Sequence, residues 1–478
     1  MICWYRAPRH RPSRSTMQRS SLRMLLPLLA AGCASAPAPR APIPYREAPA
    51  PHLRDPASTE HLDHTHEDRV PEPSAPSPVS LGGILAYADL HSPVLAVARS
   101  TRSRADAARA AAAPLVPDNP ALSIAVGPRM AKGGTGLEID VSLLQPLEIA
   151  GERGLRREAA ERTAELTDAE IEQLRWFVHC DVHAAFHHAL VEQERAQLAE
   201  RVVVFQQGVL RVVERQIAAG ETPPLTLRLA QAEVAQAQQL LVAARQAFWI
   251  ARLRLAQLAG WPVATPPSPG GAVDTPREPE SRQRLLEVAR AHLPSLRAHG
   301  ARLREAKARA AAADRESWAE PSIGAQYRRE GSTGPEGATD IVMGVVALPL
   351  PLFQRNQPER AAARADATIA RAELEASLRL LEGQVTEAHS QVVAAAARAR
   401  AYASEILPRF EENLTLLQRS FELGEIDILS LSAGRERFLR IQSDALAAQL
   451  DYFVALAGLE RVVGVDLWRD DHHEEHAP

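Results

Sequence analysis

Three histidines stand at helical spacing in a long helix-forming segment. His179, His183 and His187 are four residues apart, so a helix would place their imidazoles along one stripe, beside Cys180. Neutral imidazole binds zinc, copper and nickel, but a tight metal site needs three or four converging ligands. His179 and His187 would lie about 12 Å apart along a helix axis. Two interpretations remain, weak metal chelation by one pair and a plain polar helix face, and the lack of convergence favours the second.

Further histidines gather near both ends of the chain, mixed with carboxylates. The two tracts contain His61, His64 and His66, and His472, His473 and His476. Tracts of this composition in unfolded segments bind metal ions loosely, or they are simply solvated tails. Composition alone leaves both interpretations open.

Cys33 follows a segment that predicts export and lipid attachment. Arg19 and Arg23 precede the apolar run 24–31, which is too short to span a bilayer. The small residues before Cys33 resemble a bacterial lipobox, in which this cysteine becomes the lipid-modified first residue of the mature chain. We therefore interpret 1–32 as a lipoprotein signal peptide. An ordinary signal peptide with an incidental cysteine is the alternative.

Composition and motifs argue against two classes of function. A formal net charge of -4, with 24% charged residues, gives no basic excess for binding nucleic acid. The sequence has no phosphate-binding glycine loop, no nucleophile elbow and no His-Glu-x-x-His motif. We expect neither an enzyme nor a bound cofactor.

The elements that position these residues occur twice along the chain. A Pro-containing helix start at 92–95 returns at 293–296, and a strand start at 119–124 returns at 320–324. A Gly-Glu helix break at 220–221 returns at 424–425. Such duplication predicts two copies of one fold unit. The predicted parts after the signal peptide are a Pro-rich tether at 33–79, the units at 80–260 and 281–465, a linker at 261–280 and an acidic His-rich tail at 466–478.

Alternating apolar and polar residues predict two strands in each unit. The strands are expected at about 120–128 and 136–147, and at about 321–329 and 338–348. In the clearest case Leu137, Ile139 and Val141 share one face. Polar, glycine-bearing loops at 129–135 and 330–337 join each pair, so each is a hairpin with a fairly long turn.

Long helices follow each hairpin. They are expected at about 151–219 and 225–259, and at about 355–423 and 428–463. The segment 152–219 has no proline, and a helix of that length would span about 100 Å. Narrow apolar stripes of Ala and Leu at heptad-like spacing predict coiled-coil packing. Pro408 predicts a kink.

Strands with one apolar and one polar face are what a transmembrane barrel requires. After the signal peptide, no segment has the roughly 18 consecutive apolar residues of a membrane-spanning helix. Four strands cannot close a barrel, because the smallest barrels have about eight. The strands must therefore be pooled across copies of the chain, eight from two or twelve from three. The alternative is a soluble protein whose hairpins form a small sandwich.

Several short motifs, in their order and duplication, resemble the TolC family of outer-membrane factors. They are Pro146-Leu147-Glu148 with Gly151-Glu152-Arg153, Pro349-Leu350-Pro351-Leu352-Phe353 with Arg355-Asn356, and the helix breaks at 220–221 and 421–429. The resemblance covers about residues 80–465 and is closest to the heavy-metal efflux branch of CzcC and CusC. It implies a mainly α-helical homotrimer with a twelve-stranded transmembrane β-barrel and a long helical coiled-coil tunnel. The implied role is a passive exit duct for heavy-metal cations in the outer membrane of a Gram-negative bacterium.

The resemblance also implies partners. These are a periplasmic adaptor (membrane fusion protein), an inner-membrane pump of the resistance-nodulation-division (RND) class, and outer-membrane lipid. The adaptor would meet helix tips at Gly220-Glu221 and Gly424-Glu425, although glycine also ends a helix where nothing docks.

The second tip carries the expected pore entrance. TolC has two aspartates there that ring the closed opening, and this sequence has Asp427 and Ser430 at these positions. A ring of Asp427 carboxylates would attract cations. A carboxylate that only stabilises a helix N-terminus explains Asp427 equally well.

Other cargoes and other classes of protein stay open at this point. Channels of this type also serve multidrug efflux and type I secretion. A periplasmic adaptor would have one helical hairpin in place of two, and a structural coiled-coil lipoprotein would leave the alternating strands unexplained.

Overall fold

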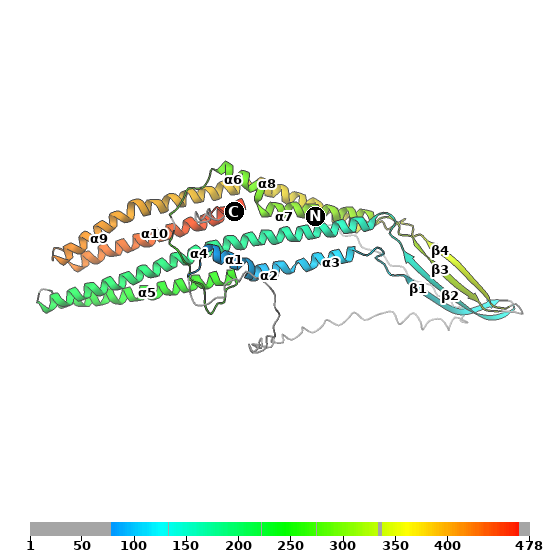
Figure 1. The fold of residues 1–478 in the computed structure, drawn as a ribbon, viewed down its shortest axis with the longest axis horizontal. Helices are drawn as coiled ribbons and strands as arrows, with labels where there is room; N and C mark the ends of the chain where they lie inside the picture. Colours follow the sequence, from blue (N-terminus) through cyan, green and yellow to red (C-terminus); the bar gives the residue numbers. More distant parts are fainter. Residues whose placement is uncertain (1–77, 132, 221, 274, 333–336, 468–478) are drawn as a thin grey trace, which may run out of the picture. The chain divides into compact units, whose positions relative to one another are not determined.

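The computed structural model describes residues 78–467, except residues 132, 221, 274 and 333–336 (Figure 1). In this part of the chain, two similar sets of helices and strands follow one another. The first set is α1 (Leu81–His91), α2 (Pro93–Ser100), α3 (Arg102–Ala112), β1 (Ala121–Ala131), β2 (Gly134–Pro146), α4 (Glu152–Ala218) and α5 (Pro224–Ala259). The second set is α6 (Arg282–His292), α7 (Pro294–Arg315), β3 (Ser322–Glu330), β4 (Thr339–Ala347), α8 (Gln357–Ala401), the π-helical turn η1 (Tyr402–Ile406), α9 (Leu407–Glu422) and α10 (Ile428–Val463).

Helix α4 is continuous over its whole length. It has no proline, and its many Ala, Leu, Glu, Gln and Arg residues are strong helix formers. Gly151 (φ 84°) precedes it, and Ala219 and Gly220 (φ 80°) end it. Its 67 residues span about 100 Å. A rod of this length needs partner helices along all of it.

Those partners form a row of helices. Near the strands the order is α3, α4, α7 and α8, and farther away it is α5, α4, α10 and α9, with each helix packed against the next (Figure 1). Helix α4 belongs to both rows. The first set of elements therefore lies on one side of the row and the second set on the other, and they meet where α4 packs on α7 and α10.

Each set has its own hydrophobic core, built at corresponding places. The first core contains Ile84, Leu95, Val182, Leu190 and Leu255, and the second contains Leu285, Leu381, Val385, Phe453 and Leu459. Val273 of the linker packs against both cores. The two halves are therefore tied together by the linker as well as by their helices.

Two glycines form equivalent joints in the two halves. Gly260 ends α5 with φ 76°, and Gly464 ends α10 with φ 82°. A Cβ at Gly260 would lie 2.1 Å from the carbonyl oxygen of His91, and a Cβ at Gly464 would lie 2.5 Å from Cα of Leu293. Only glycine combines a positive φ with such a close approach. The same joint in both halves supports the predicted duplication.

The four strands form one antiparallel sheet in the order β1-β2-β3-β4. Strands β2 and β3 join the two halves, with register from Glu138 opposite Glu330 to Pro146 opposite Ser322. The first hairpin has a shorter turn than the sequence predicts, because Ala131 already pairs with Gly134. Pairing thus continues through residues that their Gly and polar composition assigns to a loop.

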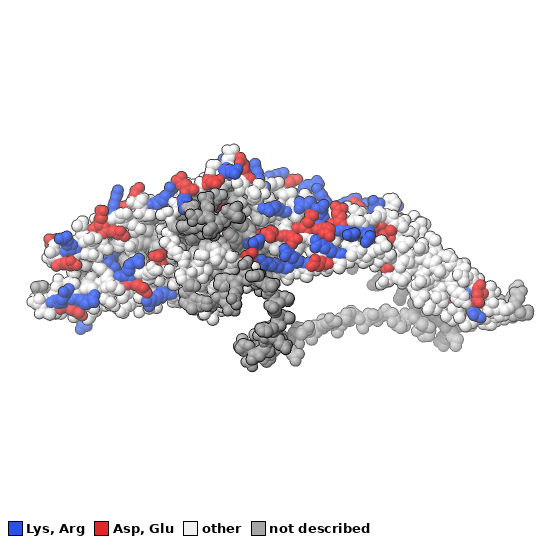
Figure 2. All heavy atoms as spheres, viewed as in Figure 1, with Lys and Arg blue, Asp and Glu red and all other residues white. Residues whose placement is uncertain are grey.

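The sheet exposes apolar side chains. On β1, Leu122, Ile124 and Val126 are each more than 60% exposed, and on β4, Val342 and Val346 are 77% and 75% exposed. Figure 2 shows charged side chains of both signs mixed over the helices on this face of the molecule. The strands carry few of them on this face, except near the far end of the sheet. An apolar surface of this kind marks a region that contacts lipid or another chain.

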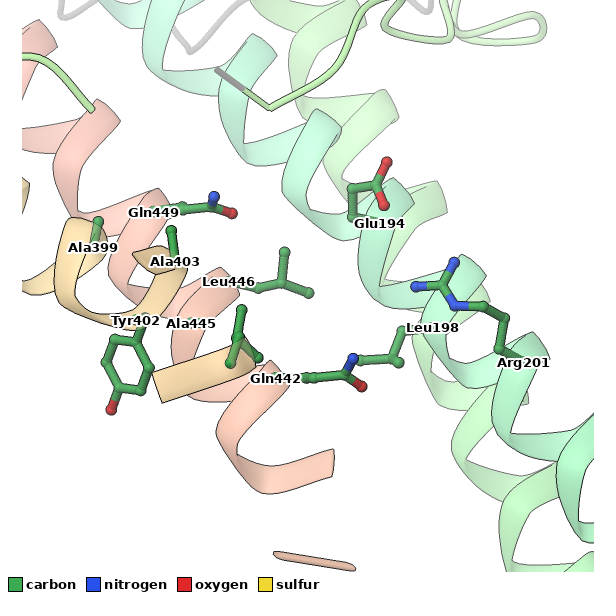
Figure 3. A pocket seen from close by; sticks show the side chains of 11 residues that line it. Glu194, Leu198, Arg201, Ala399, Tyr402, Ala403, Gln442, Ala445, Leu446 and Gln449 are labelled. Atoms are coloured by element: carbon green, nitrogen blue, oxygen red, sulfur yellow. The ribbon is translucent and has the colours of Figure 1, made fainter. Parts of the chain in front are cut away.

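The predicted kink at Pro408 takes the form of a π-helical turn. Helix runs from Gln357 to Glu422, with η1 immediately before α9 and its Pro408. Proline has no N–H for the carbonyl of Ser404, and a π-turn accommodates such a defect within a helix. Tyr402 and Ala403 of this turn border a cavity of about 120 Å³ between the helices (Figure 3).

One stretch, Leu81–Ala112, is long and apolar enough on average to cross a membrane. The structure divides it into α1, α2 and α3, at Ser92 and Thr101. Ile84 and Leu95 of this stretch are buried in the first core. We therefore assign it to the helical body.

The predicted fold class is confirmed for the protomer. It is mainly α-helical with one small antiparallel sheet, and its long paired helices lie where the sequence expects them.

Candidate functional site

The first helix tip is the turn between α4 and α5. The Gly220 N–H donates to the Ile217 carbonyl at 2.9 Å, which ends α4. Pro224 then starts α5 at a position where a missing N–H costs nothing. A Cβ on Gly220 would meet no atom within 4 Å, so this turn faces open space. Glu221, predicted to dock the adaptor, lies outside the described residues.

The second tip is the turn between α9 and α10. Gly424 (φ 77°) donates its N–H to Phe421 O at 3.0 Å, and Glu425 donates to Ser420 O at 2.9 Å. These bonds satisfy the last carbonyls of α9, as a left-handed glycine cap does. A buried cluster of Val209, Val213, Ala230, Phe421 and Leu431 lies behind both turns. The structure thus brings the two predicted tips together on one apolar base.

Asp427 and Ser430 form a helix cap. Asp427 has an extended backbone, and its Oδ1 accepts a hydrogen bond from the Ser430 N–H at 2.9 Å. Hydrogen bonding from Ser430, by its side chain first and its backbone second, lowers the pKa of Asp427. The carboxylate is therefore both a cap and an exposed negative charge at the tip, as both interpretations of the sequence require.

The middle of the histidine stripe is used for packing between the two halves. His183 Nδ1 lies 2.7 Å from Glu460 Oε2, and both side chains are buried. The other carboxylate oxygen of Glu460 accepts from the Leu467 N–H at 3.0 Å. Trp176 Nε1 donates to the main-chain carbonyl of Glu460 at 3.2 Å. These contacts join α4 to the end of α10.

Both flanking histidines stack on aromatic rings, and His179 Nε2 also lies 3.8 Å from Asp466 Oδ2. His187 stacks on Phe453 with ring centroids 3.9 Å apart, and burial lowers the pKa of His187 to about 2. His179 stacks on Trp176, and burial lowers its pKa as well. Burial raises the pKa of the Cys180 thiol, as expected for a small packed residue. The imidazoles of His179 and His187 are therefore neutral at physiological pH.

The stripe does not form a metal centre in this structure. Within the described residues, no group of three or more His, Cys, Asp or Glu side chains is placed to hold a metal ion. His179, His183 and His187 remain spread along α4, and His183 faces Glu460 on α10. The other predicted metal ligands, His61, His64, His66, His472, His473 and His476, lie outside the described residues, as does Cys33.

Sequence reasoning missed Arg435 on α10, two turns from the second tip. It is only 8% exposed, and its guanidinium lies 3.5 Å from the ring centroid of Phe205 on α4. The only signal in the sequence was an arginine on the apolar side of a heptad-like pattern. That signal does not separate a buried arginine from a solvated one.

Comparison with known proteins agrees with this geometry. A family model described as outer membrane efflux protein matches residues 87–261 and 285–465, which correspond to the two structural halves. The cobalt-zinc-cadmium resistance protein CzcC of Cupriavidus metallidurans is 26% identical over 322 residues, which cover 67% of this chain and 75% of that protein.

Solved structures of outer-membrane channels share the fold. The CmeC outer membrane channel of Campylobacter jejuni matches with a TM-score of 0.64 over 85% of this chain and 93% of its own, at 11% identity. CusC matches with a TM-score of 0.57 over 84% of this chain and 99% of its own, at 15% identity. At such identities the likeness establishes the arrangement of helices and strands.

Proposed function

Since this chain belongs to the outer membrane efflux protein family, we propose that it is the exit duct of a tripartite efflux system for heavy-metal cations. The family and fold are those of outer-membrane channels and not of enzymes. The observation that carries the proposal is the combination of an apolar four-stranded sheet with α4, a helix about 100 Å long that packs against several partner helices. Such a protomer suits a conduit that crosses one membrane and continues through the space beneath it.

We propose a homotrimer, as the family of outer-membrane channels implies, because the number of strands requires only that more than one chain takes part. Strands β1 and β4 each have one neighbour in the described chain, so both edges of the sheet are free to pair. Four strands cannot close a transmembrane barrel, and three chains would supply twelve. We expect a native mass of three protomers for the detergent-purified protein. A stable monomer without affinity for bilayers would contradict the proposal.

The metal cargo is inferred from the relative. CzcC is named for resistance to cobalt, zinc and cadmium. The test is a deletion strain grown in graded zinc, cobalt and cadmium, with and without the gene restored on a plasmid. We expect loss of tolerance to at least one of these metals and recovery on complementation. Unchanged metal tolerance with lost drug tolerance or lost polypeptide secretion would identify a different cargo.

We propose that an inner-membrane RND pump and a periplasmic adaptor complete the system, and that the adaptor meets the two tips. Support comes from the exposed turns at Gly220 and Gly424 and from the common apolar base behind them. Three Asp427 carboxylates around the same opening would favour cations. Asp427→Asn should lower the cation preference of single channels in planar bilayers while keeping the cap. Unchanged selectivity and gating would leave Asp427 with a capping role only.

Lipid attachment is proposed at Cys33. The support is the short apolar run and the small residues that precede it. Radiolabelled palmitate should be incorporated into the wild type and not into Cys33→Ser. Equal labelling of both proteins would refute the assignment.

The histidine tracts of the two tails are proposed as loose metal contacts. They contain His61, His64 and His66, and His472, His473 and His476. Calorimetry with zinc on the full chain and on a variant with all six changed to Ala would test this. Equal heats would refute metal binding by the tails and would leave the proposed cargo unaffected.

A further inference from the structure

Arg435 is a buried cation on α10, two turns from the second tip. Its guanidinium packs over the Phe205 ring at 3.5 Å, and its Nε is fully buried without a hydrogen-bond acceptor. No described residue forms an ion pair with it. Arginine presents five N–H donors and accepts none. Contact with an aromatic face offsets part of the cost of burial but satisfies no donor.

The charge persists despite burial. Desolvation lowers the pKa of Arg435 to about 10, so the side chain is still protonated at neutral pH. A buried charge without a partner is costly, and buried arginines in proteins are normally paired. An acceptor from outside the described chain would remove this cost.

The space for such an acceptor is a cavity of about 270 Å³ beside Arg435. Gln206 of α4, Glu233 and Gln236 of α5, and Ser432 and Glu436 of α10 contribute to its lining. Neither carboxylate forms an ion pair with Arg435. Glu436 pairs with Arg440 at 3.0 Å, and Glu233 accepts from Gln206 at 3.4 Å. The cavity is open, and it lies where helices of both halves meet.

The order of the helices indicates what can reach this cavity. At this level the row is α5, α4, α10 and α9 (Figure 1). A second copy of the chain would extend the row at α5 or at α9, the two helices with a free side. Arg435 instead borders a groove over α4, between α5 and α10, inside one protomer. The groove thus stays available to a different partner when copies of the chain assemble side by side.

We propose that an acidic side chain on a helix of the periplasmic adaptor enters this groove and pairs with Arg435. The inference rests on the proposed function, because it requires an adaptor at the helix tips. A carboxylate matches the planar fork of the guanidinium and can accept two of its N–H groups. Arg435 is then a specificity-determining residue, which rejects partners that lack a carboxylate at this position.

The test measures binding of the purified adaptor that restores metal efflux with this chain. The full-length channel in detergent is compared as wild type, Arg435→Met and Arg437→Gln. Arg437 is the matched control, since it lies on the same helix but is exposed and does not line the cavity. We expect Arg435→Met to weaken binding at least tenfold, or about 1.4 kcal/mol, and Arg437→Gln to change it less than twofold. An adaptor variant with one Asp or Glu changed to Arg should restore binding to Arg435→Glu.

Stability of the free channel separates recognition from a structural role. A structural arginine would lower the melting temperature when removed, whereas removal of an unpaired buried charge should leave it equal or raise it. Equal binding by wild type and Arg435→Met would overturn the inference, as would weaker binding that merely follows a lower melting temperature. Absence of any binding by the wild type would instead refute the proposed function.

Discussion

Replacing Glu460 by glutamine tests whether the buried pair with His183 joins the two halves of the protein. Two groups lie against different oxygens of Glu460, His183 Nδ1 at 2.7 Å and the Leu467 N–H at 3.0 Å. The Leu467 N–H donates, and in the tautomer of His183 with a proton on Nδ1 the ring donates as well, so both oxygens accept. Glutamine keeps the shape of the side chain but offers one oxygen and one NH₂ group. One of the two donors must then face another donor.

The magnitude follows from that loss. A buried donor left without an acceptor costs about 1–3 kcal/mol. The shorter bond to His183 should keep the remaining oxygen, and the Leu467 amide should lose its partner. We therefore expect the free energy of unfolding to fall by about 1–3 kcal/mol. The last turn of α10 should open more often, by about tenfold for each 1.4 kcal/mol.

The assay combines hydrogen exchange with urea unfolding. Exchange of the peptide that contains Leu467 should accelerate by about tenfold or more, and the urea midpoint should fall. Glu436→Gln is the control, because Glu436 lies on the same helix in an ion pair with both partners more than 70% exposed. Such surface pairs contribute about 0–1 kcal/mol. If Glu460→Gln behaves like this control in both measurements, the pair does not hold the two halves together.

Three further predictions use the same structure. Gly464→Ala should lower the melting temperature much more than Gly424→Ala. Both residues have positive φ, but only Gly464 has a neighbouring backbone within 3 Å of the new Cβ. Equal changes in melting temperature would show that this close backbone contact does not matter for stability. Folded His187 stays neutral down to a pKa of about 2, while in the unfolded chain it takes up a proton near pH 6.5, so acid favours unfolding. Urea unfolding should therefore show stability falling below pH 6.5, by up to about 1.4 kcal/mol per pH unit, and His187→Leu should reduce that slope. The pKa of Asp427 is lower in the folded chain than in the unfolded chain, so its cap stabilises the fold above the unfolded pKa and is lost as the pH falls through the folded pKa. Amide hydrogen exchange at the start of α10 should therefore rise in this pH range in the wild type and not in Asp427→Asn.

The regular features of this fold could be predicted because each depends on local pattern. The absence of proline and the spacing of Ala and Leu predict α4, and glycines at 220 and 424 predict the tips. Duplication along the sequence predicts two similar halves, and the Gly260 and Gly464 joints show how closely the halves correspond.

The missed features depend on residues that are distant in the sequence. The spacing of His179, His183 and His187 predicts one stripe, but nothing near them indicates that Glu460 would pair with His183. Arg435 looks like any surface arginine until Phe205 is placed beside it. Pro408 predicts a defect in the helix, but a proline alone does not specify that the defect is a π-turn.

The order of the helix row also sets the symmetry that a partner would encounter. Each protomer has one seam of its own, where α4 meets α10. Each contact between copies would add a second seam, where α9 of one chain meets α5 of the next. A closed trimer would then alternate three seams that carry Arg435 with three that lack it. A ring of six identical helical hairpins from a partner would bind in two distinct modes, one at each kind of seam. A ring of three hairpins would occupy only one kind of seam.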